Sequence, residues 1–212
     1  MNDGQFRVPE VEDQKIWVPF VDLMAGTVAV LIIFFLGIAI IGLRERRNRE
    51  ESVEVALSKI EQRIVAANLS DMITVDPKKR RISLTDAVFE SGSSCLSEKA
   101  MDALRQVGIE QLLPLLQKEQ SFQILVEGHT DTRPLGRVVA SPCGAFNDNY
   151  SLSAARANTA RSVLLSDWPD EYERRVSIAG YGPSRLLIPS DPFDGRNRRV
   201  EIRIETEKAI TQ

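Results

Sequence analysis

The 212-residue sequence has one histidine, His129, and two cysteines, Cys95 and Cys143, and this scarcity of soft ligands limits its chemistry. The cysteines form no Cys-x-x-Cys pair, and His129 has no second soft ligand near it in the sequence. We therefore expect no metal site. No nucleophile elbow or other hydrolase pattern accompanies His129, Asp131 and Ser153, so we expect no enzyme and interpret His129 as structural.

Long runs of one charge sign are also absent. The formal net charge is −3, and acidic and basic residues are mixed along the polar part of the chain. Because no extended basic face is indicated, nucleic acid is not an expected partner. After a membrane segment is subtracted, the length leaves room for one domain with one core.

One segment is almost free of charge. From Ile16 to Leu43 the only charged residue is Asp22, and the 21 residues after it carry none. At about 1.5 Å per residue these reach roughly 31 Å, against a hydrocarbon core of about 30 Å. We predict a transmembrane helix over residues 16–43, preceded by a tail of residues 1–15. A cleaved signal peptide is the alternative, but the run exceeds a typical h-region, and arginines follow it instead of a cleavage site.

Asp22 is an ionisable residue within this membrane segment. Such a residue costs about 2.5 to 3.5 kcal/mol at the centre of a helix and usually marks a functional pathway. The alternative is an interfacial carboxylate among the lipid headgroups, because Asp22 lies near the start of the apolar stretch. Its position alone leaves both interpretations open.

Residues 44–69 predict a helical stalk or linker. Val53, Leu57, Ile60 and Ile64 recur at spacings of four, three and four residues, with charged residues between them. This pattern favours a short heptad seam that pairs two copies of the chain. A single amphipathic helix that packs on its own domain would give the same pattern.

Residues 70–206 alternate between strand and helix patterns. The predicted elements are a hairpin of 72–75 and 81–84, a helix of 98–118 capped by Ser97, a strand of 122–127, a helix of 154–166 capped by Ser151 or Ser153, and closing strands of 175–179 and 200–204. This order predicts an α/β (α+β) domain with two main helices on a small mixed sheet, followed by a tail of residues 207–212.

Several motifs within this domain resemble the OmpA-like peptidoglycan-binding family. They are Val88-Phe89-Glu90-Ser91-Gly92-Ser93, Gly128-His129-Thr130-Asp131, Asn149 with Leu152-Ser153-Ala154-Ala155-Arg156-Ala157, Gly180-Tyr181-Gly182, and Asn197-Arg198-Arg199-Val200-Glu201-Ile202. The loop of residues 132–148 is longer than the family's loop, so it could cover the site or alter its ligand.

The resemblance implies binding of the peptidoglycan stem peptide, whose diaminopimelate side chain ends in an ammonium and a carboxylate on one carbon. By motif position, Asp131 would bind the ammonium and Arg156, in the first turn of its helix, would bind the carboxylate. Asn149 and Leu152 would form the pocket wall, and Arg198 would lie near the site. The alternative is a turn-capping Asp131 and a solvated Arg156.

The segment Trp17-Val18-Pro19-Phe20-Val21-Asp22-Leu23-Met24 resembles the start of the membrane helix in MotB-like stator B subunits. In that family the aspartate carries H⁺ or Na⁺, a B-subunit homodimer lies inside a ring of MotA-like subunits, and the peptidoglycan domain anchors the dimer. The resemblance implies the same for Asp22, with no cofactor.

The acidic N-terminal tail and the compact stalk are closer to ZorB of the Zorya anti-phage systems, which has a ZorA-like partner, than to flagellar stators. A motility stator and a non-conducting tether to the cell wall remain alternatives. A TolR- or ExbD-like transducer is disfavoured by the OmpA-like domain.

The orientation of the helix is contested within the sequence. Four arginines follow the helix and two basic residues precede it, which favours a cytoplasmic C-terminus. The implied ligand lies outside the inner membrane of a bacterium, so we expect a cytoplasmic N-terminus and a periplasmic domain. In that oxidising compartment Cys95 and Cys143 are expected to form a disulfide, with two free buried thiols as the alternative.

Overall fold

The structure is a computed structural model that describes residues 14–90, 92–135 and 143–206. The chain divides into two compact units, residues 1–48 and residues 49–212. Most of the predicted N-terminal tail, the whole C-terminal tail and the middle of the long loop lie outside the described residues. The predicted division into stalk and domain at residue 69 differs from the observed boundary at residue 48, because the end of the first helix belongs to the second unit.

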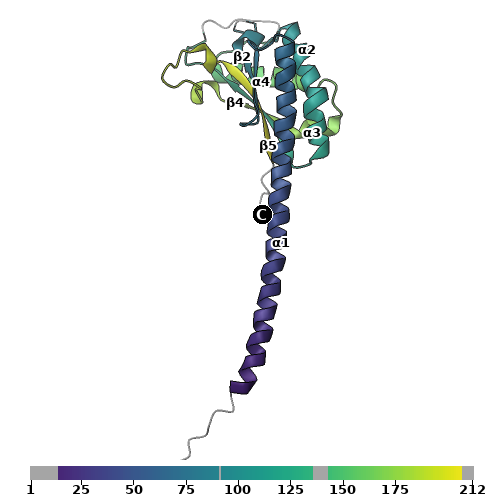
Figure 1. Ribbon diagram of the computed structural model, residues 1–212. Coiled ribbons are helices and arrows are strands. Elements are labelled where there is room, and N and C mark those ends of the chain that lie inside the picture. The colour runs from purple at the N-terminus through teal and green to yellow at the C-terminus, as the bar shows by residue number, and fades with distance from the viewer. Residues whose placement is uncertain (1–13, 91, 136–142, 207–212) are drawn as a thin grey trace, which may run out of the picture. The chain divides into compact units, whose positions relative to one another are not determined.

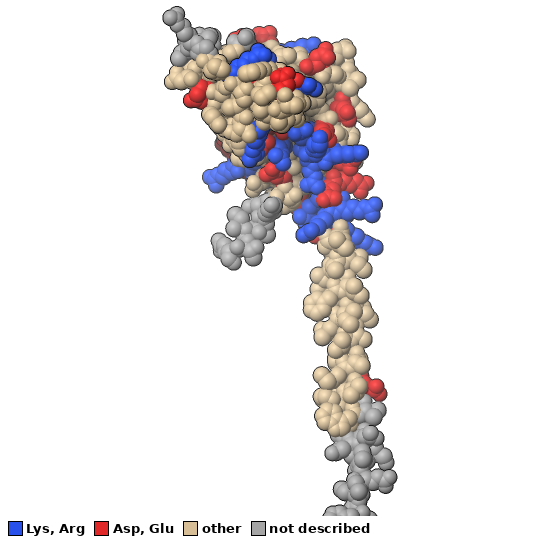
Figure 2. Space-filling view, turned by 90° about the vertical axis from the view of Figure 1, so that its left-hand side faces the viewer, with Lys and Arg blue, Asp and Glu red and all other residues tan. Residues whose placement is uncertain are grey.

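Helix α1 (Gln14–Ala66) carries the predicted membrane segment. Apolar side chains on every side of the helix are exposed between Leu23 and Leu43, and Figure 2 shows a stretch of the helix without a charged atom. Among the described residues, this helix alone is long and apolar enough to cross a membrane, judged by length and composition. A helix that is apolar all round requires an apolar environment, such as the interior of a lipid bilayer.

The last part of α1, residues 49–66, packs into the core of the second unit. Val53, Leu57 and Ile60 have no exposed surface and Ile64 has 4%. The prediction that these residues form the seam of a dimer stalk is therefore wrong, and the alternative of a helix on its own domain holds. A spacing of three and four residues marks one apolar face but does not identify its partner, and here the partner is the domain itself.

The sheet has the order β1-β2-β5-β3-β4. The hairpin is confirmed, and the parallel pair β3 and β4 makes the sheet mixed, as predicted. The strands are β1 (Ile73–Asp76), β2 (Arg81–Thr85), β3 (Phe122–His129), β4 (Val176–Gly180) and β5 (Arg199–Thr206). β5 lies between β2 and β3 and is antiparallel to both, so the C-terminal strand joins the hairpin to the rest of the sheet.

The first predicted domain helix is present with a local distortion. It consists of α2 (Glu98–Val107), a π-helical turn η2 (Gly108–Leu112) and α3 (Leu113–Lys118), and the predicted cap is confirmed, since Ser97 accepts from the backbone of Ala100. A Cβ on Gly108 would lie 2.8 Å from the carbonyl oxygen of Leu164, so only glycine permits this close approach to α4 (Asn149–Leu165).

The helices bury the apolar face of the sheet, and the end of α1 runs beside α2 and α3 (Figure 1). An ion pair between Arg63 and Glu110 joins α1 to η2, and Lys118 donates to Ser52 at 3.4 Å. Short 3₁₀ turns complete the domain: η1 (Asp86–Val88), η3 (Asp170–Arg175), η4 (Gly182–Ser184) and η5 (Gly195–Asn197).

Replacement of Leu57 by alanine tests whether the end of α1 belongs to the domain core. Because Leu57 has no exposed surface, Leu57→Ala should cost about 2 to 5 kcal/mol of unfolding free energy. Val55, on the same helix and 49% exposed, is the matched control, and Val55→Ala should change stability by less than about 0.5 kcal/mol. Thermal unfolding of the full chain in detergent measures both. If the loss of unfolding free energy caused by Leu57→Ala disappeared when the protein was diluted to a monomer, Leu57 would instead lie at the seam of a dimer stalk.

Candidate functional site

The candidate site forms where β3 ends and α4 begins. Thr130 and Asp131 follow the last residue of β3, and both are buried. Asn149 is the first residue of α4, and Arg198 lies between η5 and β5. Asp86 opens η1, directly after β2. Four separate parts of the chain therefore bring their polar side chains to one end of the sheet.

Helix α4 begins five residues earlier than predicted. Its N-cap is Asp148, whose carboxylate accepts from the backbone of Ser151 at 2.7 Å, whereas the prediction named Ser151 or Ser153. Ser153 has another role, since its hydroxyl accepts from the backbone of Gly182 at 2.9 Å. The earlier cap corrects the position of Arg156, which lies in the second turn and not in the first.

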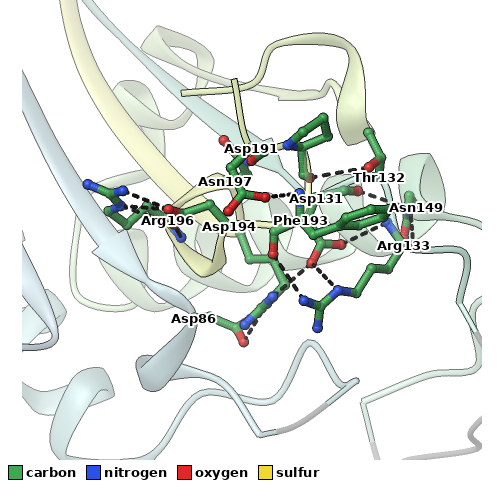
Figure 3. Close-up of polar contacts among 12 residues, drawn as sticks. Asp86, Asp131, Thr132, Arg133, Asn149, Asp191, Phe193, Asp194, Arg196 and Asn197 are labelled. Carbon is green, nitrogen blue, oxygen red and sulfur yellow. Dashed lines mark hydrogen bonds and ion pairs between the residues drawn. The ribbon is translucent and has the colours of Figure 1, made fainter. Parts of the chain in front are cut away.

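Two aspartates and two arginines form a continuous polar chain, here called the acid–arginine chain. Arg156 Nη1 donates to Asp86 Oδ1 at 2.8 Å, and Arg198 Nε donates to Asp86 Oδ2 at 2.9 Å. Arg198 Nη1 in turn donates to Asp131 Oδ2 at 2.8 Å. Arg198 therefore links the carboxylates of Asp86 and Asp131, both of which are labelled in Figure 3. Arg156 therefore reaches Asp131 only through Asp86 and Arg198.

The two arginines of this chain differ in their surroundings. The side chain of Arg156 is 3% exposed, donates to the carbonyl of Ser93 at 2.9 Å and lies 4.8 Å from the ring centre of Phe89. Burial lowers the pKa of Arg156, and the charge of Asp86 only partly offsets this. Burial also opposes the charge of Arg198, but its hydrogen bonds to the two aspartates outweigh that effect and raise the pKa of Arg198.

The remaining predicted site residues surround Asp131. Asn149 Nδ2 donates to the carbonyl of Asp131 at 3.3 Å and to that of Arg133 at 2.8 Å, so it holds the chain just after β3. Leu152 is buried and precedes Arg156 by one helical turn, which places both on the same face of α4. The predicted alternative of a solvated Arg156 is therefore wrong, because that side chain is buried.

Asp86 is the residue of this site that the sequence did not indicate. Asp86 precedes the Val88-Phe89 motif and accepts from both Arg156 and Arg198. Asp86 and Arg198 are 112 residues apart in the sequence. No spacing rule relates positions so far apart in the chain. The available signal was a carboxylate at the end of a predicted strand, beside a family motif.

The predicted disulfide between Cys95 and Cys143 is present in the structure, with the Cα atoms 5.3 Å apart. Beside it, the hydroxyl of Ser94 donates to the carbonyl of Cys143 at 2.9 Å. The neighbouring Ser93 provides the carbonyl that binds Arg156. The bond therefore fixes the segment before α4 against the segment that holds one of the site's arginines.

A second buried cluster lies on the other face of the sheet, where ligand atoms of Glu127, His129 and Glu201 lie within 4.8 Å of one another. Both carboxylates already form ion pairs with arginines. Glu201 pairs with Arg81 and Arg199. Glu127 pairs with Arg185 and Arg203. A cation would have to displace these arginines, so we assign a structural role to the cluster.

Burial alone would raise the pKa values of Glu127 and Glu201, but their hydrogen-bond and ion-pair partners lower both pKa values. The resulting stability is present above the usual glutamate range and is lost as the pH falls.

A family model described as the OmpA family matches residues 88–199, which include the acid–arginine chain except Asp86. The chain belongs to the OmpA family.

Two solved structures are similar to this chain in fold. One, a MotB-like protein from Desulfovibrio vulgaris, is 23% identical over 76% of this chain and 98% of its own, with a TM-score of 0.54. The other, the cell wall anchor of the T6SS from Pseudomonas aeruginosa, is 24% identical over 72% and 97%, with a TM-score of 0.52. A search of curated proteins finds no match to this chain.

The disulfide predicts a simple result in mass spectrometry. When the protein is purified from bacterial membranes and alkylated under denaturing conditions without reduction, neither Cys95 nor Cys143 should be modified. In the chain-entropy model a bond across a separation of 48 residues stabilises the fold by about 4 kcal/mol. Reduction before alkylation is the control and should label both cysteines. Two labelled cysteines without reduction would contradict the bond and the expected periplasmic location.

Proposed function

We propose that the protein anchors a membrane complex to peptidoglycan through its OmpA-family domain. The observation that carries the proposal is the acid–arginine chain, which places acidic and basic groups alternately at one end of the sheet. A ligand group with an ammonium and a carboxylate on one carbon complements such an arrangement, because each charge meets its opposite. The domain acts by binding, and no enzymatic step is proposed.

The end of the diaminopimelate side chain is such a group. Its ammonium would bind Asp131, which is 4% exposed and therefore largely desolvated. Its carboxylate would bind the guanidinium groups of Arg198 and Arg156, which Asp86 holds in position. In the unliganded chain Arg198 occupies one oxygen of Asp131, so ligand binding exchanges an internal ion pair for one with the ligand. Such an exchange lowers the net affinity but excludes ligands without both charges.

We further propose that the protein is the B subunit of an ion-driven stator. Asp22 supports this, because it is the ionisable residue at the start of an apolar helix that resembles the MotB-like membrane helix. It would alternate between neutral and charged forms as H⁺ or Na⁺ crosses the membrane, and so bias the position of a MotA- or ZorA-like ring. The homodimer would form elsewhere than at the seam of α1, whose apolar face is buried in the domain.

Among stators, the compact link between membrane helix and domain supports a Zorya-type defence role over a flagellar one. The domain begins at Arg49, only six residues after the apolar segment ends at Leu43. The domain would be periplasmic, since both its ligand and the disulfide belong to that compartment. The protein would then be a single-pass inner-membrane protein with a cytoplasmic N-terminus, against the arginine bias.

Replacement of Asp131 tests the wall-binding site. Asp131→Asn keeps the shape but removes the charge that faces the ammonium, so cosedimentation of the full chain with peptidoglycan should weaken about tenfold or more. Asp102→Asn is the matched control, because Asp102 is an exposed aspartate with one ion pair on α2. Unchanged cosedimentation of Asp131→Asn, with the control also unchanged, would refute the assignment of this site.

Replacement of Asp22 tests the stator role. When the chain is coexpressed with the A-type membrane protein from its own gene neighbourhood, the two should copurify, and Asp22→Asn should abolish ion flux without loss of the partner. Glu45→Gln, at the other end of the apolar segment, should leave the flux intact. Ion flux through Asp22→Asn complexes would contradict the ion-carrier role, and failure to copurify any partner would favour the non-conducting tether.

A further inference from the structure

Three arginines form ion pairs with the two aspartates of the acid–arginine chain. Asp86 pairs with Arg156 and Arg198, and Asp131 pairs with Arg198 and, more loosely, with Arg133. A zwitterionic ligand group that binds Asp131 and the two inner arginines leaves the guanidinium of Arg133 to meet another part of the ligand. A further carboxylate of the ligand would pair with it.

Arg133 is the outermost of the three arginines. Its side chain is 62% exposed, against 32% for Arg198 and 3% for Arg156. Its Nε lies 3.8 Å from Asp131 Oδ2, so it borders the pocket proposed for the ammonium. Figure 3 shows Arg133 beside Asp131, between the start of α4 and the segment that carries Phe193. It is therefore the arginine best placed to meet a group of the ligand outside the buried pocket.

The structure holds Arg133 in place from several directions. Its backbone N–H donates to Asp131 Oδ1 at 3.2 Å, and its carbonyl accepts from Asn149 at 2.8 Å. Its Nη2 donates to the carbonyl of Phe193 at 3.3 Å, and its guanidinium lies 5.6 Å from the centre of that ring. A guanidinium fixed in this way loses less rotamer freedom on binding than a free surface arginine.

Within the part of the chain that the structure describes, Asp131 is the only carboxylate that forms an ion pair with Arg133. Asp194 pairs with Arg196 at 2.6 Å, and Asp191 accepts from the backbone of Phe193 at 3.1 Å. Within the described ranges, Nη1 of Arg133 has no hydrogen-bond partner. The ring of Phe193 is half-exposed and adds an apolar surface beside this donor. Together they form a wall that suits a carboxylate attached to a peptide backbone.

We infer that Arg133 recognises a second carboxylate of the stem peptide, the free α-carboxylate of the γ-linked glutamate that precedes diaminopimelate. The inference rests on the proposed function, because it assumes that diaminopimelate occupies the acid–arginine chain. It makes Arg133 a specificity-determining residue. The site then prefers stem peptides with a free carboxylate over stem peptides in which this group is an amide, since the amide has no charge to pair with the guanidinium of Arg133.

Calorimetric titration of the full chain in detergent with two synthetic tripeptides tests the inference. Both peptides are L-Ala-γ-D-Glu-meso-diaminopimelate, one with the free α-carboxylate on the glutamate and one with its amide. The natural chain should bind the acid about threefold to fivefold more tightly, as expected for one exposed charge pair. Arg133→Gln should bind both peptides equally, at the affinity that the natural chain has for the amide.

Arg196→Gln is the matched control, because Arg196 is an equally exposed arginine nearby whose charge is already paired with Asp194. It should keep the preference for the acid. Equal binding of both peptides by the natural chain, a preference that survives Arg133→Gln, or a preference lost equally in Arg196→Gln would each overturn the role of Arg133 while leaving the proposed function intact. Binding of neither peptide would instead refute the proposed function.

Discussion

The carboxylate of Asp86 accepts from two arginines of different elements, Arg156 on α4 and Arg198 before β5. Both guanidiniums would repel each other without this shared acceptor, and one of them is almost completely buried. Arg198 donates to Asp86 through Nε and to Asp131 through Nη1, so the same guanidinium that Asp86 binds also contacts Asp131. Asp86 therefore holds the two arginines of the acid–arginine chain together without itself contacting Asp131.

The fold supplies this arrangement by bringing distant segments to one end of the sheet. β5 pairs with both β2 and β3, which places the residues just before β5 beside those that follow β2 and β3. The close contact of Gly128 with α4 completes it, since a Cβ on Gly128 would lie 1.9 Å from the carbonyl oxygen of Ser153. A larger residue there would push α4, and with it Arg156, away from the sheet.

The sequence was sufficient for the parts of the structure that depend on local pattern or on family motifs. The hairpin, the cap at Ser97, the mixed sheet and the disulfide were predicted correctly. The partner of the apolar face of α1 was not, because the same spacing serves a second copy or the chain's own core. Asp86 was missed for a related reason, since its partners are fixed by the topology of the sheet and not by sequence spacing.

The start of α4 illustrates a third limit. Ser151 and Ser153 are both good caps, but Asp148 precedes them and a carboxylate accepts from the helix N-terminus at least as well. Local preference could not choose among the three. The shift of five residues matters, because it places Asn149 within the helix and turns its amide toward the two carbonyls after β3.

A crystal structure of the OmpA-family chain bound to a tripeptide that contains meso-diaminopimelate would test the proposed binding site most directly. We expect the ligand's ammonium within about 3 Å of Asp131 and its carboxylate against Arg156 and Arg198, with Arg198 released from Asp131 and still bound to Asp86. A bound tripeptide that lies elsewhere on the domain, with the contact between Arg198 and Asp131 unchanged, would contradict it.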